Sequence, residues 1–327
     1  MKNKFNKNIT ILIQIASWSL GLLIAAFLII QIDTNVLKKA FLEARLTPFI
    51  ILMGVFVFFW LFFESYNLHI IIRKYAAKVS YAHITLLRAV TYLLMLVNYN
   101  LGIGGILLGL SFKHGLSLKD STAIVLLYTF IDFFSLSLLT LVSTAAIKKF
   151  ISSPVLVGLF TASLCFLITL LAIYLFFTNI NKIQHLIPVW LYKLTASLNH
   201  ELSLITLSDL LKFTLYRILY FLSFTVFFYF AIPFFHFHIP FVALLALLPP
   251  IFFIGNLPIT PAGIGTIQAA MLFFFNQYGD YSSILLFSIS YTTLMLLYRL
   301  SIGFSGLLFF NKNKYPFESI DKHAPCL

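Results

Sequence analysis

Long apolar stretches separated by short polar connections are the feature that most constrains this chain. A helix needs about 20 apolar residues to cross a bilayer. With 61% hydrophobic and 10% charged residues, the chain has more apolar surface than a soluble core can bury. We therefore expect an all-α polytopic membrane protein with a single transmembrane domain over residues 1–327. The six stretches long enough for full transmembrane helices are 10–32, 47–72, 120–147, 154–180, 211–235 and 281–310.

Two further apolar tracts, 84–110 and 240–278, are interrupted by residues that disfavour a helix. The first contains three glycines within residues 102–105, and each glycine weakens a helix by about 1 kcal/mol. The second contains two prolines within residues 255–265, and each proline removes a backbone donor. Irregular backbone at membrane depth is tolerated only where it is buried in protein or lines a cavity. We expect each tract to form a helical hairpin.

The distribution of Lys and Arg decides how these hairpins enter the membrane. If each hairpin returns to its own side, 15 of these residues lie on the inner side and 5 on the outer side. If 84–110 crosses as one span, the numbers are 9 and 11, which gives no bias. The stretch 10–32 is too long for a signal peptide and is expected to be retained. We therefore predict a multi-pass protein of the cell (inner) membrane with both termini cytoplasmic.

The order of elements predicts an inverted repeat. Residues 1–150 and 154–310 each give two spans, a hairpin and a further span, and three full crossings per half turn the second half upside down. The hairpins are then oppositely oriented, and both contain Gly-Ile-Gly, at 102–104 and 263–265. Matched breaks of this kind point to a transport site. The alternative is that Gly and Pro merely allow close helix packing.

The connection 181–210 is the largest polar segment between spans. Its apolar residues recur at helical spacing and are flanked by lysines, so we expect a cytoplasmic interfacial helix, with an ordinary loop as the alternative. A short polar tail follows at 311–327.

The chain has no recognisable catalytic or cofactor motif. Its two cysteines, Cys165 and Cys326, are too few for a zinc site, and no metal site is expected. The net charge of +12 is distributed between apolar runs, which indicates topology signals and not nucleic-acid binding. We expect no enzyme activity and no cofactor.

Four charged residues fall within the predicted spans, where charge is costly and usually faces a cavity or a partner. Asp132 and Arg299 lie on the last spans of the two halves, so we predict that they pair across the repeat interface. Such a pair could also serve only to hold helices in register. Glu64 lies in the inner half of its span, and Arg217 is expected to snorkel to the cytoplasmic surface.

Polar groups gather at the two helix breaks. Backbone N–H groups freed there can bind phosphate oxygens, and neighbouring side chains add neutral donors and acceptors. Tyr128 lies one turn before Asp132 on the same face. With Glu64, Asp132, Arg299 and Tyr128, the predicted headgroup-binding residues are Asn98, Asn100, Gly102, Gly104, Gly105, Asn256, Pro258, Thr260, Pro261, Gly263, Gly265 and Gln268.

The segment Leu257-Pro-Ile-Thr-Pro-Ala-Gly-Ile-Gly-Thr-Ile-Gln-Ala269 is similar to the Pro-x-x-Pro-Gly-Gly-x-Gly-x-x-Glu-Ala tract of the lysylphosphatidylglycerol synthase transmembrane family. The segment from Asn98 to Asp132 and the pair Tyr298-Arg299 also resemble that family. The resemblance implies a flippase-like fold.

This chain departs from the family's usual residues at three places. Ile106 and Gln268 stand where the family often has Glu, and Tyr128-Thr129 stands where it often has Arg. These departures weigh against a preference for a cationic aminoacyl lipid. No synthase domain follows Leu327, so we expect that the chain does not itself aminoacylate lipids.

Translocation of a polar or phospholipid between leaflets is the function that the sequence favours, with membrane lipids as ligands. The alternative is a non-transporting accessory or scaffold subunit for a separately encoded lipid- or glycan-modifying enzyme. A third hypothesis is an intramembrane enzyme, for which Asp132 and Tyr128 are the only candidate catalytic residues. A homodimer is compatible with each hypothesis.

Overall fold

The computed structural model describes five helices that are long and apolar enough to cross a membrane. The predicted span 10–32, most of the segment 181–210 and most of the tail lie outside the described residues. The described residues are 40–75, 77–97, 99–113, 116–147, 154–183, 206–257, 260, 263–310 and 318–319.

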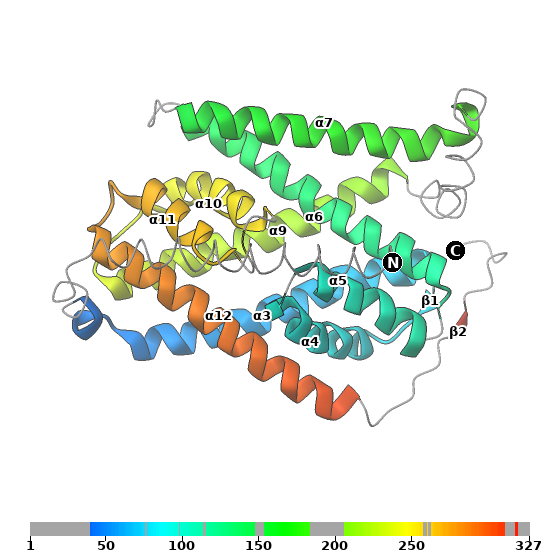
Figure 1. Ribbon diagram of the computed structural model, residues 1–327, viewed down its shortest axis with the longest axis horizontal. Helices are drawn as coiled ribbons and strands as arrows, with labels where there is room; N and C mark the ends of the chain where they lie inside the picture. Colours follow the sequence, from blue (N-terminus) through cyan, green and yellow to red (C-terminus); the bar gives the residue numbers. More distant parts are fainter. Residues whose placement is uncertain are drawn as a thin grey trace, which may run out of the picture.

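These long helices occupy the predicted spans, and Figure 1 shows them running along the length of the molecule. The helix α7 lies along one edge, mostly exposed, and α6 is its main neighbour among the described elements. The long helices are α3 (Leu46–Tyr75), α6 (Leu118–Ile147), α7 (Pro154–Ile183), α9 (Leu207–Ala231) and α12 (Tyr281–Phe310), and the short 3-10 helix η3 (Ile232–Phe235) extends α9. The chain is an all-α polytopic membrane protein.

Both interrupted tracts are broken helices. The first forms α4 (Tyr81–Val97), α5 (Tyr99–Leu108) and the π-helical turn η1 (Gly109–Lys113). The second forms α10 (Phe241–Asn256) and α11 (Thr266–Phe275). The only strands among the described residues are two-residue segments, β1 (Ala77–Lys78) and β2 (Glu318–Ser319), which pair antiparallel.

The glycines of the first tract do not break the helix, which corrects the prediction for residues 102–105. They lie inside α5, where two of them let α5 approach α4 closely. A Cβ at Gly102 would collide with the Met95 side chain, and one at Gly105 with Leu94. The packing interpretation is therefore correct at these two positions.

The prolines predicted to break the second tract, Pro258 and Pro261, lie outside the described residues, but two other prolines affect the helix before the break. Pro249 and Pro250 lie inside α10, and Pro249 cannot donate to the carbonyl oxygen of Leu245. The hydroxyl of Ser143 on α6 lies 3.5 Å from that freed oxygen, and Thr140 Oγ1 donates to the Pro249 oxygen at 3.2 Å. The Ser143 hydroxyl of α6 thus lies next to the oxygen that Pro249 leaves without a helical donor, and Thr140 adds a second contact between α6 and α10.

Helices of the two halves contact one another in matching pairs. The helix α4 packs on α12 as α10 packs on α6, and α3 packs on α4 as α9 packs on α10. Likewise α5 contacts α6 as α11 contacts α12, while α3 and α9 contact each other. A pseudo-two-fold relation between the halves would produce this pattern, although their orientation in the membrane stays a prediction.

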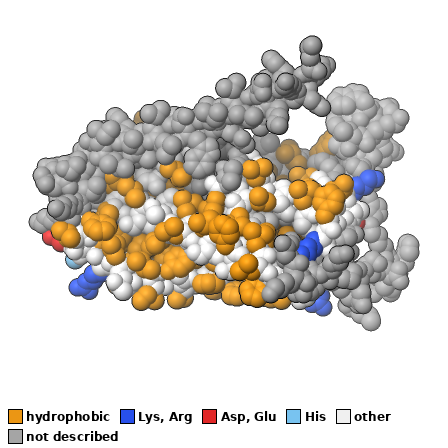
Figure 2. All heavy atoms as spheres, turned by 60° about the horizontal axis from the view of Figure 1, so that its bottom comes forward, with side chains coloured by type: hydrophobic (Ala, Val, Ile, Leu, Met, Phe, Trp, Pro, Cys, Tyr) orange, Lys and Arg blue, Asp and Glu red, His pale blue; other side chains and the backbone are white. Residues whose placement is uncertain are grey.

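Aromatic side chains fill much of the core. Trp60 of α3 stacks on Phe224 of α9 with ring centroids 4.0 Å apart, and Phe49 meets Phe235 edge-on at 5.0 Å. The outer face of the bundle is also apolar: Figure 2 shows hydrophobic side chains over its middle, with Lys and Arg toward its ends. Such a surface suits lipid as the solvent.

Candidate functional site

Five charged side chains from five different helices line one cavity of about 310 Å³. Most of its lining lies near the middle of the long helices, such as Asp132 in α6 and residues 291–299 in α12. The ends of α4 and α10 that adjoin the two breaks complete the wall. The charged residues are Glu64 of α3, Arg88 of α4, Asp132 of α6, Arg217 of α9 and Arg299 of α12.

Glu64 is 3% exposed and lies at the centre of a hydrogen-bond network. Its Oε2 accepts from Nε and Nη2 of Arg88 at 2.9 and 2.8 Å, and from the Tyr92 hydroxyl at 3.1 Å. Its Oε1 accepts from the Tyr220 hydroxyl at 2.5 Å. A carboxylate inside an apolar bundle is costly unless its lone pairs are satisfied, and here three residues of α4 and α9 satisfy them.

Asp132 pairs with Arg217 and not with Arg299, so the predicted Asp132–Arg299 pair is wrong. Arg217 Nε lies 2.5 Å from Asp132 Oδ1, and the guanidinium lies 4.2 Å from the Tyr220 ring centroid. The Tyr128 ring lies 5.6 Å from the same group. Packing of α6 on α9 brings these groups together.

The expectation that Arg217 snorkels is also wrong, since the residue is 4% exposed. The helix α9 begins at Leu207, so Arg217 is about 15 Å along its axis, too deep to reach the helix end. That end is fixed by Asp209, which caps the helix with Thr206 and pairs with Lys74 of α3.

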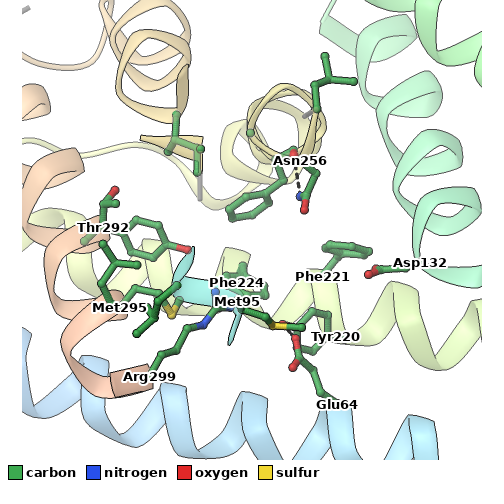
Figure 3. Close-up of a pocket in the computed structure, with 18 of the residues that line it drawn as sticks. Glu64, Met95, Asp132, Tyr220, Phe221, Phe224, Asn256, Thr292, Met295 and Arg299 are labelled. Atoms are coloured by element: carbon green, nitrogen blue, oxygen red, sulfur yellow. Dashed lines mark hydrogen bonds between the residues drawn. The ribbon is translucent and has the colours of Figure 1, made fainter. Parts of the chain in front are cut away.

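Arg299 has a different environment. It makes no salt bridge or hydrogen bond with a described residue, and its guanidinium lies 5.2 Å from the Tyr92 ring centroid. Figure 3 shows its side chain reaching from α12 into the cavity, while Asp132 lies on the far side beyond Phe221. Arg299 is thus a cation of the cavity without a carboxylate of its own in the described part of the chain.

The second break forms part of the cavity wall through Asn256, Leu257, Thr260 and Gly263. Gly263 and Gly265 have φ angles of 72° and 85°, which L side chains rarely adopt, so glycine is required for this turn. The Thr260 and Thr266 hydroxyls lie 3.1 Å apart and join the two sides of the break.

Gln268 stabilises this turn through two hydrogen bonds. Its Oε1 accepts from Gly265 N at 2.6 Å, and its Nε2 donates to Thr292 Oγ1 of α12 at 2.9 Å. Both ends of the amide are therefore occupied by the protein. Gln268 lies outside the cavity wall and acts as a link between α11 and α12.

The structure separates the sequence-predicted site residues into three groups. Asn98, Pro258 and Pro261 lie outside the described residues. Those that line the cavity are Glu64, Asn100, Asp132, Asn256, Thr260, Gly263 and Arg299. Those that do not are Gly102, Gly104, Gly105, Tyr128, Gly265 and Gln268.

Arg88 and Tyr220 are cavity residues that sequence reasoning missed. The 15 Lys and Arg residues assigned to the inner side include Arg88, yet this residue is 2% exposed and bonds Glu64. Its place inside the apolar run Ile84–Val97 was the available signal, because a charge within such a run is a functional candidate by default. Tyr220 carried no signal in a chain with 16 tyrosines.

The cavity can hold a polar group, but the described residues do not suggest a metal. No group of three His, Cys, Asp or Glu residues among them could hold an ion. What the wall offers instead is guanidinium, hydroxyl and amide groups in apolar surroundings, where electrostatic contacts are stronger than in water.

Comparison with known proteins agrees with this architecture. No curated protein matches the chain. A family described as the lysylphosphatidylglycerol synthase TM region matches residues 14–303, which include every described helix up to the last turns of α12. The chain therefore belongs to the family of lysylphosphatidylglycerol synthase transmembrane regions.

Proposed function

We propose that this integral membrane protein translocates a polar or phospholipid between leaflets, with the headgroup passing through the cavity between the two broken tracts. The observation that carries the proposal is the charged cavity midway along the long helices. Charged side chains at membrane depth are expensive, and they typically mark the path of a polar substrate.

The lengths of the broken helices support re-entrant hairpins. The helices α4 and α10 are about 25 Å long and α5 and α11 about 15 Å, at 1.5 Å per residue. Each is shorter than the hydrocarbon core of about 30 Å. A hairpin that enters and leaves on one side would place its break inside the membrane, beside the cavity.

The matching neighbour pairs support a mechanism of alternating access. In transporters built from inverted repeats, substrate sites lie near the midplane at the repeat interface, next to discontinuous helices. The ion pair between Asp132 of the first half and Arg217 of the second, across the contact of α6 with α9, supports a site at the interface of the halves. Rocking of one half against the other would open the cavity to each leaflet in turn.

Reconstitution in liposomes tests the proposal. The purified chain is incorporated into vesicles containing lipids with a fluorescent acyl chain, and a membrane-impermeant reductant then bleaches the outer leaflet. We expect bleaching to proceed beyond the outer-leaflet fraction. Arg217→Gln should slow it, whereas Lys212→Gln, which removes a charge from an exposed position of the same helix, should not. Bleaching equal to that of empty vesicles for every headgroup would refute transport.

The non-transporting alternative predicts a different outcome. An accessory subunit would co-purify in mild detergent with a stoichiometric lipid- or glycan-modifying enzyme and would show no translocation. Mass spectrometry of the purified sample separates the two functions.

A further inference from the structure

We infer that the headgroup carried by this cavity is anionic: a phosphate ester without a compensating amine. The inference rests on the proposed function and names its substrate class. It follows from the charge balance of the cavity wall, in which three arginines face two carboxylates among the described residues. The wall thus has an excess of one positive charge.

Arg299 accounts for this excess. Arg88 is bonded to Glu64 and Arg217 to Asp132, whereas the contact of Arg299 is with the ring of Tyr92. A cation–π contact with a tyrosine ring stabilises a cation but leaves its charge uncompensated. An anion bound beside Arg299 would neutralise the remaining charge.

Arg217 supplies a second donor. Its Nε bonds Asp132, but its Nη1 is buried and has no hydrogen-bond acceptor among the described residues. A buried guanidinium nitrogen without an acceptor is costly, and phosphate oxygens match the planar donor geometry of arginine. Arg217 and Arg299 line the same cavity, from α9 and α12. We therefore place the phosphate group in this cavity.

The carboxylates argue against a cationic substituent on that headgroup. Glu64 already accepts from Arg88, Tyr92 and Tyr220, and Asp132 accepts from Arg217. An added ammonium group could bind Glu64 only by displacing one of these contacts, and the charge of Asp132 is already balanced by Arg217. The expected ligand thus differs from the lysyl lipid in the family's description.

The transport test compares three acyl-labelled lipids in vesicles of zwitterionic carrier lipid: phosphatidylglycerol, phosphatidylcholine and lysylphosphatidylglycerol. We expect phosphatidylglycerol to move about tenfold or more faster than the lysyl lipid, which corresponds to one charge-assisted contact. Arg299→Gln should abolish this ratio, and Arg73→Gln, the same change at an exposed position, should leave it intact. Equal or faster movement of the lysyl lipid would overturn the inference while leaving transport in place.

A binding test distinguishes a wrong headgroup assignment from a wrong proposal of lipid transport. Thermal unfolding in detergent is measured with water-soluble short-chain phosphatidylglycerol, short-chain phosphatidylcholine or inorganic phosphate. Stabilisation by phosphatidylglycerol alone, lost in Arg299→Gln, supports an anionic lipid site even if no lipid is translocated. Stabilisation by inorganic phosphate to the same extent would overturn the lipid assignment. Equal shifts with both lipids would overturn the charge preference.

Discussion

Replacing Glu64 with Gln removes one charge from the centre of the buried network and keeps nearly the same volume. The carboxylate accepts two hydrogen bonds from Arg88 and one each from Tyr92 and Tyr220. The Gln amide offers a single acceptor oxygen, and its NH₂ group would face donors. Breaking one partner of a buried pair costs about 3–5 kcal/mol. Since both side chains of the pair are below 5% exposed, solvent screening does not reduce this figure.

Thermal unfolding in detergent measures the effect. At about 2–4 °C per kcal/mol, Glu64→Gln should lower the apparent Tm by roughly 6–20 °C at a fixed scan rate. The double variant Glu64→Leu/Arg88→Met should unfold closer to the wild type than either single variant, because no charge is left alone. Glu43→Gln, at an exposed position, should cost less than about 1 kcal/mol. A Glu64→Gln protein that unfolds within 2 °C of the wild type would refute this account.

Three further predictions concern the packing and the buried polar groups. Gly102→Ala should destabilise the protein by about 1–3 kcal/mol, because its Cβ would overlap Met95, whereas Gly104→Ala has open space and should be neutral or stabilising by thermal unfolding. Asn67→Leu should be neutral or stabilising, since neither amide atom of this buried residue is hydrogen-bonded to a described residue; a large loss of stability would contradict this expectation. Gln268→Leu should cost about 2–3 kcal/mol through two lost hydrogen bonds, and limited proteolysis should then cleave near the second break first.

The long helices could be predicted from sequence because their signal is local. A run of about 20 apolar residues satisfies its backbone internally and needs no knowledge of its neighbours. The spans predicted at 47–72 and 281–310 correspond to α3 and α12. The existence of the two broken tracts was predictable for the same reason. The position of the first break was not, because Gly102 and Gly105 were needed for contact with α4 and tolerated inside α5.

The pairing of charges could not be predicted, because it depends on which helices touch. The end of an apolar run indicates where a helix reaches the membrane surface, and by this criterion Arg217 lies near the surface. The helix α9 begins ten residues earlier, at Leu207, so Arg217 lies deeper. Arg88 lies near the start of an apolar run, so the same criterion assigns it to the polar residues at the membrane surface. The sequence does predict Glu64, Asp132 and Arg299 as site residues, because each lies well inside an apolar run. Symmetry then suggested the partner Arg299 for Asp132, whereas the contact of α6 with α9 selected Arg217.

The ion pair between Asp132 and Arg217 also affects how the chain is made. The two residues are 85 positions apart, so at about 5–20 residues per second the ribosome reaches Arg217 roughly 4–17 s after Asp132. During that interval the aspartate has left the ribosome without the arginine that will neutralise it. Insertion of α6 must therefore wait for α9, or proceed before this ion pair can form. The first half can therefore reach its final structure only after the second half has been synthesised. A chain truncated before α9 should be a substrate for membrane quality control.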